Sequence, residues 1–257
     1  MAKGLAIKFN SYEHSVPKIL ELVNLQKELK KYDNIVIKVP LNPDSENKLS
    51  INFVDSVLSF IMAHKNPVSS VYIAEGSDGA DTMDLFENEG YSSLSEKYGV
   101  GLLDLNTSET EEIRDSEFLQ FEEIYYPKIL LNSFIISLAK TGVSNSTVIE
   151  GSLFNMIGTY PASHYKGFFS KGKSKLKRYN IKHLIHDILK CKMPDFAVID
   201  ASTEGMVLAG LPLEMDKQIA RLLNLEWRNI PYLRLLDEAL PSIKEEKPQE
   251  SIRETLA

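Results

Sequence analysis

The sequence contains a single cysteine, Cys191, among 257 residues. One thiol excludes an internal disulfide, and it excludes an iron–sulfur cluster or zinc site that needs several cysteines from one chain. Long apolar runs are also missing, since the best candidate, residues 129–139, includes Asn132 and Ser133 and is about half the length of a membrane-spanning helix. The amino terminus lacks the apolar stretch and cleavage site of a secretory signal. These absences predict a protein of the reducing cytoplasm.

Net positive charge is concentrated in one segment of an otherwise acidic chain. The net charge is −7, yet residues 164–192 hold nine lysines and arginines against one acid, Asp187. Nucleic-acid binding is not expected, because it needs basic charge across a whole face of the protein. The basic segment fits either a lid over an anionic ligand or a solvated loop and helix edge. No membrane partner is expected, and the sequence sets no oligomeric state.

Short apolar runs alternate with helical patterns along most of the chain. This alternation is typical of βα units around a largely parallel sheet. The predicted strands are residues 5–9, 35–39, 71–74, 100–105, 134–138, 196–199 and 206–209. The predicted helices are residues 15–29, 51–64, 80–89, 128–131, 181–189, 213–223 and 231–240. We therefore expect an α/β fold, a single compact domain over residues 1–240 with a mostly parallel or mixed sheet and helices on both faces.

Two stretches fall outside this alternation. Residues 107–117 are rich in acidic side chains, which indicates an exposed loop, and an extended run follows at residues 118–125. The tail, residues 241–257, is charged and almost free of apolar side chains. Such a composition cannot bury enough apolar surface to fold, so we expect the tail to be disordered.

Several motifs occur in an order that resembles a known family. They are Ile37-Lys38-Val39-Pro40-Leu41-Asn42, Ala74-Glu75-Gly76, Gly90-Tyr91, Asp104-Leu105-Asn106, Lys140-Thr141-Gly142, Asn155-Met156-Ile157-Gly158, Val198-Ile199-Asp200 and Ile230-Pro231-Tyr232-Leu233. Over about residues 34–240 the chain is similar to the family catalogued as domain of unknown function 362. The resemblance places Lys38, Lys140 and Asn155 at positions of the family's motifs.

The chain also departs from the family pattern. The family's Lys-Thr-His ends in Gly142 here, and the lysine of its Lys-Asn-x-x-Gly segment is Phe154. The aspartate before the closing proline is Leu211, and the loop after Asp200 is short. Many family members carry cysteine clusters for iron–sulfur centres, and none exists here. The resemblance therefore implies a divergent, compact member without an iron–sulfur cluster.

Two lysines stand at the ends of predicted strands, Lys38 and Lys140. Ligands of open α/β sheets bind at the carboxyl edge of the strands, and two ammonium groups there would favour a carboxylate or a phosphate. The alternative is that each lysine only reaches water past its strand. Asn155 would lie near the Lys140 strand, where its amide could bind a ligand or cap a helical turn.

The loop at residues 75–79 reads Glu-Gly-Ser-Asp-Gly and precedes a predicted helix. A phosphate cradle is disfavoured, because the Gly-x-Gly-x-x-Gly pattern is missing and the acids would repel phosphate. Glu75 and its neighbouring acids could bind Mg²⁺ beside an anionic substrate, or Asp78 and Asp81 could cap the helix. A divalent metal is thus a candidate cofactor, and no metal-ligand set is predicted.

His164 and Asp200 are the candidate catalytic residues. Family members often have a histidine near the position of His164, and imidazole is the usual proton carrier near neutral pH. Asp200 ends a predicted strand, and Glu204 follows it. The two carboxylates could act as an acid/base pair or serve as ordinary turn residues.

Three other side chains have two interpretations each. His183 and His186 share one face of a predicted helix, which suits a metal pair but more simply a solvated surface. Cys191, between two lysines, could have a lowered thiol pKa or be a half-buried structural residue.

These observations lead to two hypotheses about function. The first is an enzyme or binding protein for a small anionic molecule, with Lys38, Lys140, Asn155 and Glu75 binding the ligand and His164 and Asp200 near it. The alternative is a non-catalytic interaction or regulatory protein that kept the fold after losing polar site residues. A redox role ranks third, because the cysteines are missing.

Overall fold

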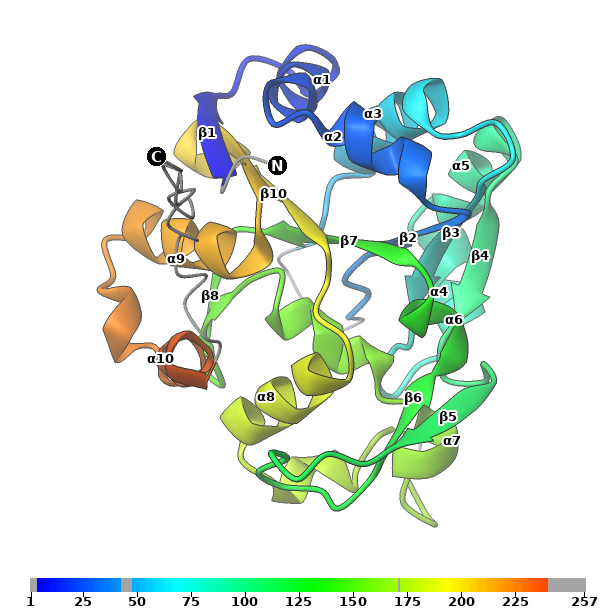
Figure 1. The fold of residues 1–257 in the computed structure, drawn as a ribbon, viewed down its shortest axis with the longest axis vertical. Helices are drawn as coiled ribbons and strands as arrows, with labels where there is room; N and C mark the ends of the chain where they lie inside the picture. Colours follow the sequence, from blue (N-terminus) through cyan, green and yellow to red (C-terminus); the bar gives the residue numbers. More distant parts are fainter. Residues whose placement is uncertain (1–3, 43–47, 171, 240–257) are drawn as a thin grey trace, which may run out of the picture.

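A seven-stranded sheet forms the centre of the protein (Figure 1). The computed structural model describes residues 4–42, 48–170 and 172–239. The strands, in the order in which they lie in the sheet, are β1 (Gly4–Lys8), β11 (Met206–Gly210), β10 (Phe196–Ala201), β7 (Phe134–Lys140), β2 (Asn34–Lys38), β3 (Ser70–Glu75) and β4 (Gly101–Asp104). The predicted α/β fold with a mostly parallel sheet is confirmed.

The side of the sheet to which the chain adds new strands changes at β2, in the centre of the sheet. From β2 the chain adds β3 and β4 on one side, and it later adds β7 and β10 on the other side, all parallel to one another. Among the described strands of this sheet, β11 alone runs opposite to the others, and it lies antiparallel between β1 and β10. The crevice beyond the carboxyl ends of β2 and β7 is therefore the switch point, where open α/β sheets bind ligands.

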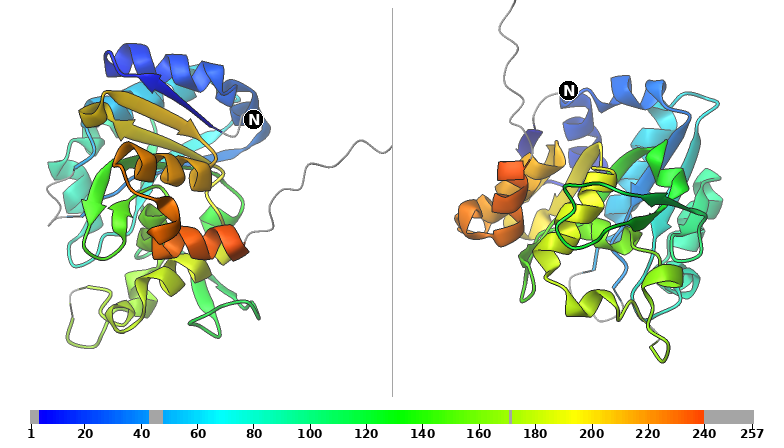
Figure 2. Two further views of the ribbon diagram at one scale, coloured as in Figure 1. Left: turned by 90° about the vertical axis from the view of Figure 1, so that its left-hand side faces the viewer. Right: turned by 60° about the horizontal axis from the view of Figure 1, so that its bottom comes forward.

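Alternating apolar side chains build one core on each face of the sheet. In β2, Ile35 and Ile37 belong to one core, whereas Val36 belongs to the other. The first core also contains α1 (Tyr12–Leu22), α3 (Ile51–His64), α4 (Thr82–Asn88) and α5 (Tyr91–Tyr98). The second contains α8 (Ile181–Cys191), α9 (Pro212–Leu222) and α10 (Pro231–Ala239), so helices cover both faces (Figure 2).

Smaller elements lie outside the sheet. Two hairpins are formed by β5 (Thr110–Ile113) with β6 (Ile124–Pro127) and by β8 (Gly142–Ser144) with β9 (Val148–Glu150). The short helical turns are α2 (Leu25–Glu28), η1 (Leu29–Lys31), α6 (Lys128–Leu131), η2 (Phe154–Thr159), α7 (Ala162–Tyr165), η3 (Leu176–Arg178), η4 (Ser202–Glu204) and η5 (Trp227–Asn229).

Two local expectations differ from the structure. The acidic stretch at residues 107–117 is not only a loop, because β5 pairs with β6 and thereby satisfies its backbone groups. The first helix begins earlier than predicted, at Tyr12, because the side chain of Ser11 accepts a hydrogen bond from the His14 backbone and caps it. Pro17 lies inside this helix.

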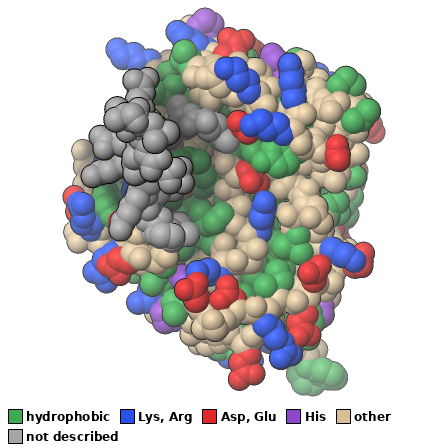
Figure 3. All heavy atoms as spheres, in the orientation of Figure 1, with side chains coloured by type: hydrophobic (Ala, Val, Ile, Leu, Met, Phe, Trp, Pro, Cys, Tyr) green, Lys and Arg blue, Asp and Glu red, His purple; other side chains and the backbone are tan. Residues whose placement is uncertain are grey.

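The tail predicted to be disordered, residues 241–257, lies outside the described residues. Among the helices that are described, none is both long and apolar enough to cross a membrane. Acidic and basic side chains are interspersed over the face shown in Figure 3, with apolar side chains between them.

Candidate functional site

A cavity of about 770 Å³ opens at the carboxyl edge of the sheet. The parallel strands β2, β3 and β7 end there with Lys38, Glu75 and Lys140. The 3₁₀ helix η2 crosses the same edge, and its Asn155 lines the cavity together with Glu75 and Lys140. The strand-end residues and Asn155 are thus brought together at the switch point.

Lys38, Glu75 and Asn155 form a hydrogen-bonded group that we call the polar floor. The ammonium of Lys38, which is fully buried, donates to Glu75 Oε2 (2.7 Å), Asn155 Oδ1 (2.9 Å) and the Val39 carbonyl (3.1 Å). All three N–H donors are therefore used. Burial lowers the pKa of Lys38, and the Glu75 carboxylate opposes this effect. Lys38 thus binds the lining residues Glu75 and Asn155 and is not itself part of the lining.

Asn155 joins the two strands at the switch point. Its amide nitrogen donates to the carbonyl oxygens of Lys38 (2.9 Å) and Leu138 (3.0 Å) and lies 3.1 Å from the Ser137 hydroxyl. These carbonyls belong to β2 and β7, so one side chain satisfies both strand ends. Asn155 therefore has a structural role in addition to its place in the lining.

Glycine is required where η2 packs against the floor. A Cβ atom at Gly158 would lie 1.9 Å from Glu75 Oε1 and 2.8 Å from Lys38 Nζ. Such distances are far inside van der Waals contact. The missing side chain at Gly158 therefore lets η2 lie directly on the buried ion pair.

A second buried lysine comes from residues 172–179, which we call the basic strap. Lys173 is 2% exposed and lines the cavity. Its ammonium donates to the carbonyls of Gly76 (2.6 Å) and Gly158 (3.0 Å), and its backbone N–H donates to Asp78 Oδ1 (2.5 Å). Burial, and secondly the Lys38 charge, lower the pKa of Lys173 to about 8, against the opposing effect of the Glu75 carboxylate.

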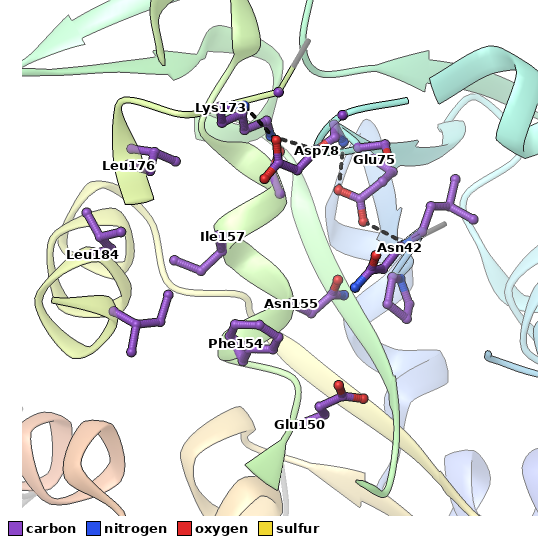
Figure 4. Close-up of a pocket in the computed structure, with 18 of the residues that line it drawn as sticks. Asn42, Glu75, Asp78, Glu150, Phe154, Asn155, Ile157, Lys173, Leu176 and Leu184 are labelled. Carbon is purple, nitrogen blue, oxygen red and sulfur yellow. Dashed lines mark hydrogen bonds between the residues drawn. The ribbon is translucent and has the colours of Figure 1, made fainter. Parts of the chain in front are cut away.

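The opposite side of the cavity is hydrophobic. We call this side the apolar wall; it consists of Phe154, Ile157, Leu176, Ile181 and Leu184. In Figure 4, η2 runs through the middle of the view, with Leu176 and Leu184 on one side of it and Asn42 and Glu75 on the other. The cavity therefore offers a polar and an apolar surface to one ligand.

The charged groups of the lining are mostly paired with each other. Lys48 binds Glu89 (2.8 Å), and Lys177 lies 4.0 Å from Asp78. The Lys140 side chain, in contrast, makes no hydrogen bond or ion pair with any residue that the structure describes. The hydroxyl of Ser77, a buried lining residue, likewise lacks a hydrogen-bond partner within the described part of the chain.

The two predicted catalytic residues lie outside the cavity lining. The His164 ring stacks on Tyr125, with 4.0 Å between ring centroids, and Nε2 lies 3.3 Å from the Thr110 hydroxyl. Burial, and secondly the Lys175 charge, lower the pKa of His164. Asp200 is buried and accepts a hydrogen bond from the Tyr12 hydroxyl (3.0 Å), although its backbone pairs with Lys140 in the sheet. Their catalytic roles stay predictions.

The Asp200–Glu204 pair has local partners. The backbone N–H of Ser202 donates to Asp200, and the Thr141 hydroxyl donates to Glu204. These are turn contacts at the end of β10. They agree with the simpler of the two interpretations of the pair.

The expectation of surface histidines is wrong for His186. His186 is 3% exposed, and its Nδ1 lies 2.8 Å from Asp187, which also accepts backbone N–H groups of residues 119–121. Cys191 is partly buried, and burial together with the Asp187 charge raises its thiol pKa to about 12, opposite to the activated-thiol alternative. Across the described residues, no three His, Cys, Asp or Glu side chains cluster as metal ligands.

Sequence reasoning missed Lys173 as a lining residue. It is one of nine basic residues between 164 and 192, and no local pattern separates it from exposed neighbours such as Lys175 and Lys177. Its buried ammonium is bound by the Gly76 and Gly158 carbonyls, which are distant in the sequence. The same holds for the apolar wall, whose members come from η2, the basic strap and α8.

Comparison with solved structures shows where this fold occurs elsewhere. The lactate racemase apoprotein from Thermoanaerobacterium thermosaccharolyticum is similar with a TM-score of 0.57 and 14% identity, over 87% of this chain and 58% of that one. A protein from Thermotoga maritima has a TM-score of 0.46 and 11% identity, over 86% of this chain and 61% of that one. This chain thus spans about three fifths of the length of either protein. The first likeness supports the α/β fold.

Comparison with sequences identifies the family. No curated protein matches the chain. The model of the family described as Domain of unknown function (DUF362) matches residues 35–215, a range that includes β2, β3, β7, η2 and the basic strap. Because this match covers well over half of the 257 residues, the chain belongs to the DUF362 family.

Proposed function

We propose that the chain binds a small organic carboxylate in the cavity at the carboxyl edge of the sheet. One observation carries the proposal: Lys140, a lining lysine without a partner among the described residues, faces the same cavity as the apolar wall. A carboxylate with a short hydrocarbon part would pair with Lys140 and place its carbon chain against Ile157 and Leu184. The buried hydroxyl of Ser77 would gain a partner from the same ligand.

The charges of the lining favour a carboxylate over a phosphate. Four acids line the cavity, namely Glu75, Asp78, Glu89 and Glu150, alongside four lysines, Lys48, Lys140, Lys173 and Lys177. A doubly charged phosphate would meet these acids without the glycine-rich helix start that usually binds it. A monoanion requires only one additional cation, which Lys140 supplies.

The likeness in fold to a solved structure gives weaker support for a carboxylate ligand. The similar structure is named a lactate racemase apoprotein, and lactate is a small carboxylate. At 14% identity this likeness shows the fold alone, so it serves to choose test ligands. Lactate and other 2-hydroxy acids therefore belong in the panel beside simple aliphatic acids.

Calorimetry with a series of straight-chain carboxylates tests the proposal. Each added CH₂ that reaches the apolar wall should improve the binding free energy by about 0.8 kcal/mol, roughly fourfold in Kd, until the wall is covered. Lys140→Met should abolish carboxylate binding, whereas Lys166→Met, which alters an exposed lysine outside the lining, should not. Tighter binding of phosphorylated compounds, or equal binding by both variants, would refute the proposal.

One observation favours the alternative of an interaction protein. Phe168 and Phe169 are 96% and 97% exposed and pack edge to face against each other at the surface. An exposed aromatic pair is a common contact site for another protein chain. If this pair mediates self-association, light scattering should show a dimer that Phe168→Ser with Phe169→Ser converts to a monomer.

A further inference from the structure

Lys173 is the most unusual charged group of the cavity. Its side chain reaches from the basic strap to the backbone carbonyls of Gly76 and Gly158, which are also lining residues. Neither acceptor is a carboxylate. The two glycines bring these carbonyls close together, because a Cβ on Gly76 would lie only 2.5 Å from the Gly158 oxygen.

The two acceptors match the hydrogen-bonding needs of a neutral amine. An ammonium has three N–H donors, whereas a neutral amine has two donors and a lone pair. Two carbonyl oxygens satisfy both donors of the amine and leave the lone pair for another partner. They would leave one donor of an ammonium unsatisfied in a buried position.

Lys38 shows the opposite arrangement. Its three donors have three acceptors, one of them the Glu75 carboxylate, so loss of its proton would leave a buried carboxylate without its counter-charge. Loss of the proton from Lys173 leaves only neutral carbonyls. Burial favours this loss most, and the Lys38 charge adds to it because two buried ammonium groups repel each other, whereas the carboxylates of Glu75, Asp78 and Asp104 oppose it.

We propose that Lys173 forms a Schiff base with the carbonyl carbon of a small oxo acid bound in the cavity. The inference rests on the proposed function, since the carboxylate of the oxo acid is the group that Lys140 would bind. A neutral lysine amine in an apolar pocket beside another cation is a known type of nucleophile towards carbonyl substrates. Lys38 and the apolar wall supply these two conditions.

The reaction is balanced without any further reactant. The Lys173 lone pair attacks the carbonyl carbon, the C=O π electrons move to oxygen, and a proton moves from nitrogen to that oxygen. The resulting carbinolamine loses its hydroxyl with a second proton as water while the C=N bond forms. Nothing is oxidised or reduced, and hydrolysis reverses the process.

Reductive trapping tests the inference. The chain is incubated with pyruvate or with 4-oxopentanoate and sodium borohydride, digested, and mapped by mass spectrometry. At pH 7 a lysine with a pKa of about 8 has a neutral fraction roughly two orders of magnitude above that of an ordinary lysine. We therefore expect one reduced adduct, on Lys173, at least about tenfold above any exposed lysine.

Two lysine-to-arginine variants test whether the adduct depends on Lys173. Lys173→Arg should remove the adduct, and Lys175→Arg, two residues away at an exposed position, should retain it. If Lys173→Arg fails to fold, the position of the adduct in the wild-type chain decides alone. Adducts spread over exposed lysines, or an absence of adducts, would overturn the inference.

Calorimetry separates the two proposals. If propionate and pyruvate both bind and pyruvate gives no adduct, the Schiff base is wrong and the proposed function stands. If neither acid binds, both proposals fail. Binding of pyruvate with an adduct on Lys173 that added propionate suppresses supports both.

Discussion

The polar floor and the basic strap each bury one lysine beside the same cavity. Lys38 in the floor is held by a carboxylate and two neutral oxygens, whereas Lys173 in the strap is held by two carbonyls. The floor is built from the ends of β2 and β3 and from η2, while the strap is irregular chain that contains the short helix η3. The comparison shows that burial alone does not fix the role of a lysine, because its partners decide whether it can give up a proton.

Removal of the floor lysine should have a large effect on stability. Lys38→Met leaves the buried Glu75 carboxylate unpaired, which we expect to lower the free energy of unfolding by about 3–5 kcal/mol. Adding Glu75→Gln should recover part of this loss. Urea denaturation of the wild-type protein, the Lys38→Met variant and the double variant measures the three free energies of unfolding.

An exposed ion pair provides the control for this experiment. Lys97 binds Asp55 at 2.7 Å, with half of the Lys97 side chain exposed. Lys97→Met should change stability far less, because water screens the pair. If Lys38→Met were as mild as Lys97→Met, the floor would not depend on its ion pair.

Alanine substitutions at Gly158 and Gly172 compare how tightly the floor and the strap are packed. Gly158→Ala forces a methyl group against Glu75 and Lys38 and should cost about 1–3 kcal/mol. Gly172→Ala meets the Asp78 carboxylate at 2.2 Å, but that side chain is 47% exposed and can move aside. The cost there should stay below about 1 kcal/mol. Thermal unfolding measures both variants, and equal losses of stability would contradict the tighter packing of η2 against the floor.

The pH dependence of stability should reveal the strap lysine. The folded-state pKa of Lys173 is lowered to about 8 from its ordinary value of 10.5, so between these values the unfolded chain binds the additional proton. Stability of the wild-type chain relative to Lys173→Met should therefore rise from pH 8 towards 10.5, by at most about 1.4 kcal/mol per pH unit. A flat difference between the two denaturation series would show that Lys173 titrates normally.

The sequence predicted the sheet well because each strand carries its own signal. Alternation of Ile35, Val36 and Ile37 between two cores requires apolar side chains on both sides, and such runs are recognisable without tertiary information. Helix α5 was not among the predicted helices, because Gly90 directly follows the helix predicted at residues 80–89 and glycine there is typical of a helix end. Its left-handed backbone, with φ of 87°, ends one helix and starts the next.

The candidate site was only partly predictable. Lys38 and Lys140 were found because strand ends of a parallel sheet meet at one edge, and Glu75 because it opens an acidic loop before a helix. Their hydrogen-bond partners could not be predicted, so the buried state of Lys38 and the structural bonds of Asn155 emerged only from the structure. Lys173 lacked a signal altogether, because distant glycines bury it.

Amide chemical-shift mapping by NMR tests the central claim, that the cavity binds a small carboxylate, most directly. Titration of the ¹⁵N-labelled chain with butyrate should shift the amides of Leu41, Gly76, Ile157 and Gly158, which line the cavity, and leave the β5–β6 hairpin unchanged. The shifts should disappear in Lys140→Met and persist in Lys166→Met. Shifts centred on another part of the chain, or none at saturating butyrate, would contradict the account.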